Sequence, residues 1–228
     1  MGEPLPVLGG LGVRARTGII GLSLLLAGAC ASPFPSFREL DVGASTEAGQ
    51  ALETLAAWRS PTRLLERVTM TRWGGELVLS VYVAAESPGE VRFAGVSDLG
   101  ATLFSVVATG ASIEVLHESP GFTAEFLREE FIPDQMAALL RPPVDDATLV
   151  STEAGRPAVH FKVGVGEALL YLGNRSEPSL VRGVDGELHS TIAWIVDDLE
   201  ASPAPPESIL ITNRVADYHA RLELAPWN

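Results

Sequence analysis

Two short segments come close to catalytic or cofactor-binding motifs, and neither is complete. A nucleophile elbow needs Gly-x-Ser-x-Gly, but the segment 95–99 has leucine where the second glycine belongs. The segment 164–169 lacks the third glycine of a dinucleotide-binding fingerprint and leads into a predicted strand, where the fingerprint needs a helix. We therefore predict that the protein is not an enzyme and that it binds no cofactor.

Ionisable side chains suited to metal binding or acid–base chemistry are scattered along the chain. The four histidines are His117, His160, His189 and His219. None lies at a metal-ligand spacing from another, so we interpret them as solvated or hydrogen-bonded side chains. Acidic pairs at 129–130, 145–146 and 197–198 have the groups to flank a sugar or a calcium ion. Solvated faces and strand ends explain these pairs more simply, and the sequence predicts no metal site.

The composition is that of an acidic globular protein. Of the 228 residues, 46% are hydrophobic, which excludes disorder as the dominant state because disordered chains lack the apolar surface that offsets the entropy of ordering. The formal net charge is −13, and Lys162 is the only lysine. Since nucleic-acid affinity comes largely from clustered Lys and Arg, we expect no nucleic-acid partner.

The N-terminal segment has the features of an export signal. Arg14 and Arg16 precede an uncharged, mostly apolar run at 18–29. A helix of this length measures about 18 Å, too short for a hydrocarbon core of about 30 Å. A basic segment, a short apolar segment and small residues at its end are typical of a secretory signal peptide, which we place at residues 1–29.

Cys30, the only cysteine, follows this segment directly. The run from Leu26 to Cys30 resembles the bacterial lipobox, in which the cysteine becomes the new N-terminus after a diacylglyceryl group is attached to its thiol. This resemblance implies a lipoprotein held to the membrane through acyl chains, of which palmitate is typical, at Cys30. The alternative is that Cys30 is a small buried hydrophobic residue. An aspartate directly after the lipidated cysteine would resemble a signal for retention in the inner membrane. This position holds Ala31, which favours the outer membrane with the domain in the periplasm.

Behind the proposed anchor, the pattern divides the chain into a tether and one domain. Residues 30–44 contain two prolines and no clear period, which predicts an extended tether. Residues 45–228 are expected to form a single domain that starts with an amphipathic helix ending at Ser60-Pro61. From residue 68 the hydrophobic period is two, and short strands are separated by Gly and Pro turns. The predicted fold class is mainly β with a few helices, as a curved antiparallel sheet or incomplete barrel.

One helical segment interrupts the strands, and one face of the sheet is strongly apolar. Residues 123–141 carry apolar side chains at helical spacing, and Pro133 is expected to divide them into two pieces, as one broken helix or two short helices. A curved sheet buries its apolar face either against helices or around a hydrophobic ligand. A cavity for an acyl chain would be lined by Leu77, Leu79, Val81, Val83, Phe93 and Phe104. A packed core made of the same side chains is the alternative.

Three phrases carry a resemblance to a known family. They span Val91–Phe104, Pro206–Asn213 and Tyr218–Leu224. Together they resemble an uncharacterised family of bacterial lipoproteins, a domain of unknown function related to the LolA and LolB lipoprotein carriers. The resemblance implies an incomplete antiparallel barrel with helices as a plug, enclosing a cavity for acyl chains, and it carries no catalytic residue.

The sequence supports two functions of different classes. The first is an outer-membrane lipoprotein that binds or transfers lipid or lipoprotein acyl chains in the cell envelope. The second is a structural or accessory envelope lipoprotein whose core is closed and holds no ligand. An open apolar cavity favours the carrier, and a closed packed core favours the accessory role.

Overall fold

The computed structural model describes most of the chain downstream of the proposed anchor. The described residues are 32–40, 63–87, 89–110, 112–139, 148–171, 180–195 and 208–226. The predicted signal peptide, Cys30 and the amphipathic helix before Ser60-Pro61 lie outside these residues. The chain separates into one unit at Met1–Cys30 and a compact unit at Ala31–Asn228, and all the described residues belong to the compact unit.

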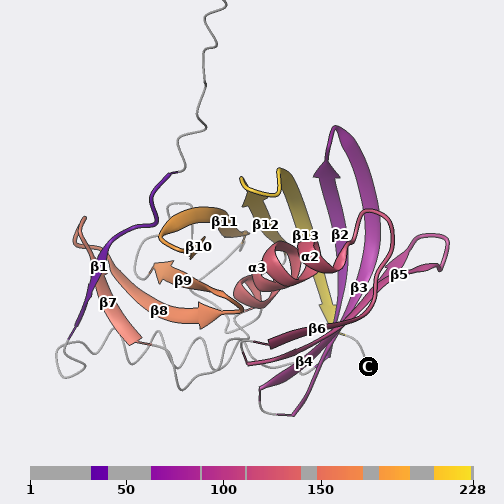
Figure 1. Ribbon diagram of the computed structural model, residues 1–228, viewed down its shortest axis with the longest axis horizontal. Helices are drawn as coiled ribbons and strands as arrows, with labels where there is room; N and C mark the ends of the chain where they lie inside the picture. The colour runs from indigo at the N-terminus through magenta and orange to yellow at the C-terminus, as the bar shows by residue number, and fades with distance from the viewer. Residues whose placement is uncertain are drawn as a thin grey trace, which may run out of the picture. The chain divides into compact units, whose positions relative to one another are not determined.

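The compact unit is built on a single antiparallel sheet that curves around a short helical segment (Figure 1). Within the described residues the sheet has thirteen strands in the order β1-β7-β8-β9-β10-β11-β12-β13-β2-β3-β4-β5-β6. The strands are β1 Phe37–Glu39, β2 Arg63–Arg72, β3 Gly75–Ser87, β4 Glu90–Ser97, β5 Thr102–Thr109, β6 Ser112–His117, β7 Thr148–Thr152, β8 Pro157–Val163, β9 Gly166–Tyr171, β10 Leu180–Val184, β11 Glu187–Ile195, β12 Ser208–Asn213 and β13 Tyr218–Pro226. Strands β1 and β6 are the edges, so the sheet does not close into a barrel.

Alternating apolar side chains give the sheet a buried concave face. In β4 the exposed Arg92 lies between the buried Val91 and Phe93, as a strand with one face in the core requires. Gly95 continues this inward face, and a Cβ at Gly95 would lie only 2.2 Å from the ring of Phe104 on β5. The absence of a side chain at Gly95 therefore lets the Phe104 ring lie flat against the sheet.

The helical segment packs on this concave face as a plug. It consists of α2 (Ala124–Phe126), a π-helical turn η2 (Leu127–Phe131) and α3 (Ile132–Ala138), which follow one another without a break. Thr123 caps its start by accepting a hydrogen bond from the backbone N–H of Phe126. Of the two alternatives, one broken helix or two short helices, the structure shows a single helix, and it is widened at the π turn instead of being broken at Pro133. Pro133 lies just after the π turn, where the wider helix accommodates a residue without an N–H.

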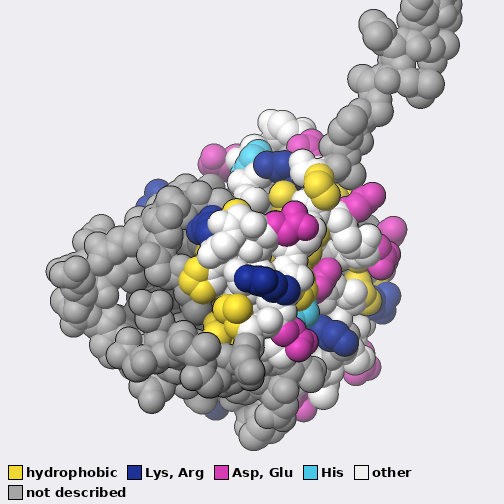
Figure 2. Space-filling model, turned by 90° about the vertical axis from the view of Figure 1, so that its left-hand side faces the viewer, with side chains coloured by type: hydrophobic (Ala, Val, Ile, Leu, Met, Phe, Trp, Pro, Cys, Tyr) yellow, Lys and Arg dark blue, Asp and Glu magenta, His cyan; other side chains and the backbone are white. Residues whose placement is uncertain are grey.

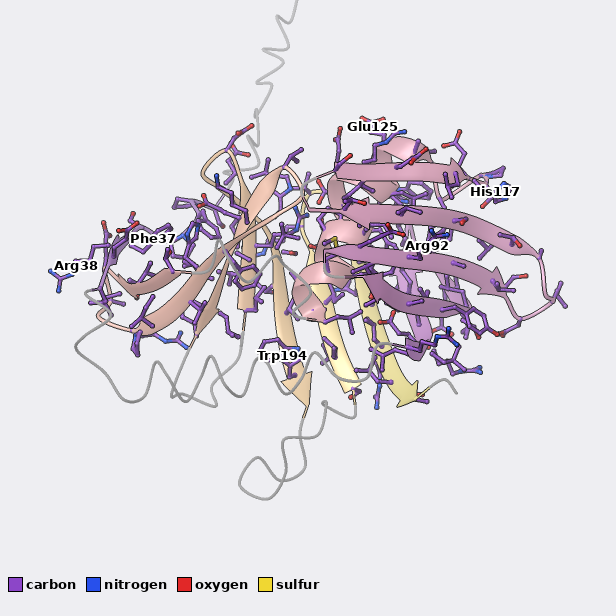
Figure 3. The ribbon with its side chains drawn as sticks, turned by 90° about the horizontal axis from the view of Figure 1, so that it is seen from below. Phe37, Arg38, Arg92, His117, Glu125 and Trp194 are labelled. Carbon is purple, nitrogen blue, oxygen red and sulfur yellow. The ribbon has the colours of Figure 1, made fainter. Side chains whose placement is uncertain are left out.

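The N-terminal described residues belong to the sheet, which differs from the tether predicted for residues 30–44. Strand β1 pairs with β7, and Phe34 is buried in a small second cluster on the outer face of the sheet. A Cβ at Gly183 would lie 2.4 Å from the Phe34 ring, so this glycine makes room for the ring. Figure 3 shows Arg38 of β1 and His117 of β6 at opposite ends of the sheet. The segment is extended as expected, but burial of Phe34 holds it against the domain.

The predicted fold class is confirmed: the protein is a curved, mainly antiparallel sheet with a helical plug. The strand patterns at 77–83, 91–95 and 218–224 correspond to β3, β4 and β13. Sequence analysis missed β7 and β10 and the first half of β2. Strand β7 is buried on both faces and β10 carries a buried arginine, so neither alternates between apolar and polar residues.

Candidate functional site

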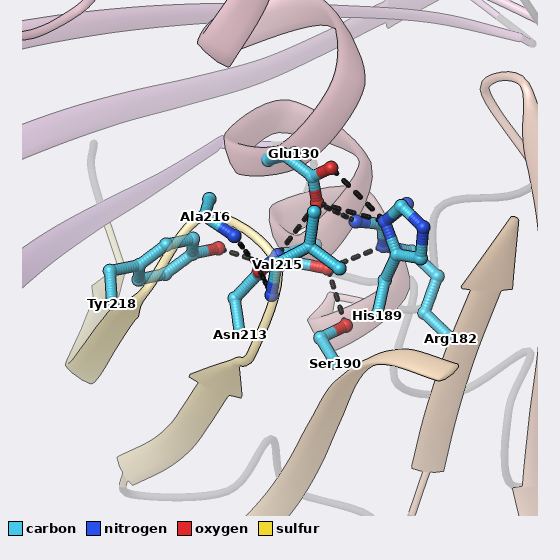
Figure 4. A network of polar contacts seen from close by, with 9 residues as sticks. Glu130, Arg182, His189, Ser190, Asn213, Val215, Ala216 and Tyr218 are labelled. Atoms are coloured by element: carbon cyan, nitrogen blue, oxygen red, sulfur yellow. Dashed lines mark hydrogen bonds and ion pairs between the residues drawn. The ribbon is translucent and has the colours of Figure 1, made fainter. Parts of the chain in front are cut away.

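A buried ionic cluster joins the plug to the sheet (Figure 4). Glu130 in η2 and Asp134 in α3 are four residues apart, which places both carboxylates on the same side of the helix. Arg182 in β10 has no exposed surface and contacts both of them. Its Nε donates to Asp134 Oδ1 at 2.5 Å, and its Nη2 donates to Glu130 Oε2 at 2.6 Å.

Polar side chains from neighbouring strands complete the cluster. Asn213 Nδ2 donates to Glu130 Oε2 at 2.8 Å and to Asp134 Oδ2 at 2.9 Å. Tyr218 and Ser190 each donate a hydroxyl hydrogen to Asp134. His189 Nδ1 lies 3.0 Å from Glu130 Oε1 at the solvent side of the cluster. These contacts satisfy most of the lone pairs of two carboxylates that would otherwise be costly to bury.

The charges in this cluster stabilise one another. Burial works against the charge of Arg182, but the adjacent carboxylates of Asp134 and Glu130 outweigh burial and raise the pKa of its guanidinium. Burial, together with the negative charge of Asp134, raises the pKa of the Tyr218 phenol well above 10.0. Tyr218 therefore remains a hydrogen-bond donor to Asp134 throughout the neutral pH range. One positive charge faces two carboxylates, so the cluster depends on its neutral donors as well as on the ion pairs.

The other end of the plug is held by aromatic contacts. The rings of Phe122, Phe126 and Phe131 lie 5.6 to 6.0 Å from one another, measured between centroids. Phe104 of the sheet packs on Phe122 at 5.0 Å. Arg72 at the end of β2 lies over the Phe126 ring and donates from Nη1 to the carbonyl oxygen of Gly121 at 3.0 Å. Burial lowers the pKa of Arg72. The other hydrogen bonds at this end are local: the Ala124 N–H donates to Glu118, the Phe126 N–H to Thr123 and the Phe122 N–H to the Ser119 carbonyl oxygen.

A pocket of about 270 Å³ opens beside this aromatic end. Its apolar lining comes from Met70, Trp73, Leu77, Leu103 and Phe122, and its charged lining residues are Arg72 and Glu76. Of the six side chains predicted to line an acyl cavity, Leu77 is in this pocket. The other five are packed in the main core with at most 1% exposure: Leu79, Val81, Val83, Phe93 and Phe104. The structure therefore places all six on the concave face of the sheet, where Phe104 contacts Phe122 and Phe131.

A second pocket, of about 280 Å³, lies on the solvent side of the ionic cluster. It is lined by Glu129, Glu130, Val165, Val184, Asp185 and His189. In the part of the chain that the structure describes, no three His, Cys, Asp or Glu side chains are arranged to hold a metal ion. This pocket therefore gives access to Glu130 and His189 without providing a metal site.

The structure changes the interpretation of one acidic pair and adds residues that sequence analysis missed. Glu129 is exposed as expected for a solvated pair, but Glu130 is 7% exposed and belongs to the cluster. Of the four histidines, His189 joins the cluster and the others make local contacts: His160 with Glu167, His117 with Thr102 and His219 with Thr212. Asp134, Arg182, Asn213 and Tyr218 were not predicted. The available signals were the four-residue spacing of Glu130 and Asp134 and a lone arginine inside an apolar strand.

The surface carries mixed charge. Figure 2 shows acidic, basic and hydrophobic side chains interspersed over the described residues of the face that holds β1 and β7, without a basic patch on it. None of the helices in the described part of the chain is long and apolar enough to cross a membrane.

A solved structure with the same arrangement identifies the fold. A LolA-superfamily protein of Nitrosomonas europaea superimposes with a TM-score of 0.52 over 79% of this chain and 92% of its own, at 12% sequence identity. The chain has a LolA-like fold. A domain named as an outer-membrane lipoprotein-sorting protein from Vibrio parahaemolyticus (8% identity, 77% and 88% coverage) and a DUF1329 family protein from Desulfovibrio piger (10% identity, 79% and 92% coverage) each give a TM-score of 0.44. No protein-family model and no curated protein sequence matches the chain.

The LolA-like arrangement agrees with the resemblance drawn from the three sequence phrases. At identities of this order the similarity establishes the fold alone.

Replacing Arg182 with methionine is expected to lower the free energy of unfolding by about 3–5 kcal/mol, because Glu130 and Asp134 would remain buried without their cation. Chemical denaturation followed by circular dichroism measures the loss. Arg221→Met is the matched control, since Arg221 is exposed and pairs with Glu223 at 3.4 Å, and we expect a change of about 0–1 kcal/mol there. A loss at Arg182 no larger than at Arg221 would contradict the structural role of the cluster.

Tyr218 should make the fold sensitive to alkaline pH. A phenol whose pKa is raised by folding contributes stability that is complete below its unfolded pKa of 10.0 and is lost as pH rises above that value. Tyr218→Phe removes the hydrogen bond to Asp134, so the free energy of unfolding at pH 7 should fall by about 1–3 kcal/mol. The variant should also lose less stability than the parent between pH 9 and pH 11, measured by urea denaturation at each pH. Parallel pH curves for the two proteins would contradict the assignment.

Proposed function

We propose that the protein is an outer-membrane lipoprotein, anchored through Cys30, that binds acyl chains of lipids or lipoproteins beneath its plug. The observation that carries this proposal is a wide apolar concave face that, within the described residues, is covered by one short helical segment. A hydrophobic ligand can take the place of part of this plug, because both present apolar groups to the sheet.

The two ends of the plug are suited to different roles in binding. The α3 end is fixed by Arg182 and its carboxylates, and breaking that contact would leave buried charges unpaired. The Phe122 end makes mainly aromatic contacts, which an acyl chain replaces at little cost because both are apolar. We infer that the loop at Gly121 and the first turn of the plug move and that α3 stays in place.

The pocket beside Leu77 marks where an acyl chain would enter. Leu77, Leu103 and Phe122 already form an apolar wall there. Movement of Phe122 away from Phe104 would extend the pocket along the inward side chains of β3, toward Leu79 and Val81. These are the residues that the sequence predicted to line an acyl cavity.

An accessory lipoprotein with a closed core is the second candidate function. The observation in its favour is the packing of Leu79, Val81, Val83, Phe93 and Phe104, which leaves at most 1% of each residue exposed. In that case the plug is a permanent part of the core, and the protein acts through its surface on other envelope components. Ligand binding distinguishes the two candidates.

The mature chain, made without the leader and with Cys30→Ser, should take up a fluorescent fatty acid that unlabelled palmitate displaces. Leu77→Glu is expected to weaken binding about tenfold or more, because the new carboxylate lies in the apolar wall of the pocket, and a loss of about 1.4 kcal/mol corresponds to tenfold in affinity. Since Leu77 is partly exposed, the carboxylate stays hydrated and the fold should survive.

Val78→Glu is the matched control for Leu77→Glu. The two residues are adjacent in β3 and point to opposite faces of the sheet, so a carboxylate at 78 leaves the pocket unchanged. Equal binding by the parent and both variants would show that the probe binds outside the pocket beside Leu77. A parent protein that binds no acyl probe would contradict the carrier function and favour the accessory lipoprotein.

Lipid attachment at Cys30 has its own test. Cys30→Ala removes the thiol that carries the diacylglyceryl group, so processing by the lipoprotein signal peptidase should fail and the leader should remain on the chain. Metabolic labelling with palmitate, followed by mass spectrometry of the N-terminus, measures both effects. A processed, membrane-held Cys30→Ala protein would contradict the anchor.

A further inference from the structure

The first described residues of the chain, which follow the proposed anchor, are held against the sheet by hydrogen bonds and by burial of a side chain. Ser32 accepts two hydrogen bonds: its carbonyl oxygen from the Leu188 N–H at 2.9 Å and its hydroxyl from Arg214 Nη1 at 3.1 Å. Phe34 follows, with its N–H donating to the Gly186 carbonyl at 2.8 Å and its ring buried over Gly183. The N-terminal segment is therefore held against the domain from Ser32 onward, at the β10–β11 and β12–β13 turns.

The chain between Ser32, the first residue held by the domain, and the proposed anchor at Cys30 is short. Cys30 precedes Ser32 by two residues, and two residues of any conformation span at most about 7 Å. The headgroup region of one leaflet is itself roughly 5–7 Å deep. A lipidated Cys30 would therefore bring the turns beside Ser32 to the headgroups, with no tether to hold the domain away.

The edge of the sheet that holds these turns also carries exposed apolar side chains. All sheet neighbours are antiparallel, so β2, β4, β6, β8, β10 and β12 end at one edge. Among the described residues, the large hydrophobic side chains that are exposed all lie at these strand ends: Trp73, Leu99, Leu116, Val165 and Val215. Val215 adjoins Arg214, which contacts Ser32, and Trp73 is in the next turn along the sheet.

We propose that this edge, at the turns β8–β9, β10–β11, β12–β13 and β2–β3, is the surface of the domain that lies on the lipid bilayer. Val165, Val215 and Trp73 enter the headgroup region, where tryptophan is especially favourable. Asp185 and Asp217 lie in these turns together with Arg214 and the chain is acidic, so we expect no net attraction of this surface to anionic lipids. The contact is apolar and needs only zwitterionic phospholipid. This inference rests on the proposed lipidation of Cys30.

The cysteine content of the chain allows a direct test. When Cys30 carries lipid, a cysteine introduced at Val215 or Val165 is the sole free thiol and takes a single environment-sensitive fluorophore. Ala154→Cys is the control, since Ala154 is exposed in the β7–β8 turn at the opposite edge of the sheet. The lipidated full-length proteins are extracted from membranes and reconstituted in vesicles of phosphatidylcholine and phosphatidylethanolamine.

We expect the labels at 215 and 165 to show blue-shifted emission and a severalfold lower quenching constant with aqueous iodide than the label at 154. Equal quenching at all three positions, or shielding at 154 alone, would overturn the proposed surface while leaving the anchor intact. Labelling of Cys30 itself and loss of the protein from the vesicles would show that the anchor is absent, and the inference fails with it.

A lengthened connection tests whether the short span sets the orientation. Ten Gly and Ser residues inserted between Ala31 and Ser32 add roughly 17 Å of reach and leave the contacts of Ser32 and Phe34 in place. The inserted protein should stay on the vesicles, but iodide should quench the label at 215 nearly as well as the label at 154. Unchanged shielding at 215 would contradict an orientation set by the anchor.

Discussion

The burial of Arg182 is the constraint on which the arrangement of the plug depends. A guanidinium with no exposed surface needs carboxylates at hydrogen-bonding distance, and the sheet around Arg182 offers hydroxyl and amide groups but no carboxylate among its described contacts. Glu130 and Asp134 therefore have to come from the plug, and their four-residue spacing sets which face of the helix meets the sheet. The remaining donors, Asn213 and Tyr218, fix the depth at which the helix lies.

This constraint makes the two ends of the plug unequal. At the α3 end, any displacement separates buried charges and exposes unsatisfied lone pairs, so that end has one favoured position. At the Phe122 end, the contacts are rings at 5 to 6 Å, which another apolar group can replace without leaving a polar atom unpaired. Arg72 is the exception, because its hydrogen bond to Gly121 must be broken or moved for the loop to open. The hinge that we propose between a fixed and a replaceable end rests on this difference in contact chemistry.

Features that follow from the local hydrophobic period could be predicted from the sequence. Features that depend on contacts between residues far apart in the chain were missed. Leu77 to Val83 alternate so regularly that the strand, its inward face and the burial of Leu79 could be predicted from position alone. Glu130 could not be separated from Glu129, because an acidic doublet on a helix is usually solvated and its partner Arg182 lies 52 residues away. Strand β1 was hidden for a similar reason: Phe34 is flanked by prolines, and only Gly183, far along the chain, provides the space that buries its ring. The LolA-like architecture was predicted only through the resemblance of three phrases to a known family, whereas the ionic cluster depends on side chains of several separate elements.

The site and the proposed membrane surface belong to the same edge of the sheet. Trp73 lies in the β2–β3 turn and also lines the pocket formed by Leu77, Leu103 and Phe122. The loop that leads into the plug leaves β6 at this edge too, so the replaceable end of the plug lies next to it.

A domain that rests on the bilayer through these turns has the pocket mouth at the headgroups. An acyl chain then moves between the bilayer and the concave face without crossing water, which removes the largest free-energy barrier to its transfer, the exposure of its methylene groups at about 0.8 kcal/mol each. In this proposal the hydrogen bonds that hold Ser32 and the position of the aromatic end of the plug act together, because an anchor at Cys30 would determine where the pocket opens.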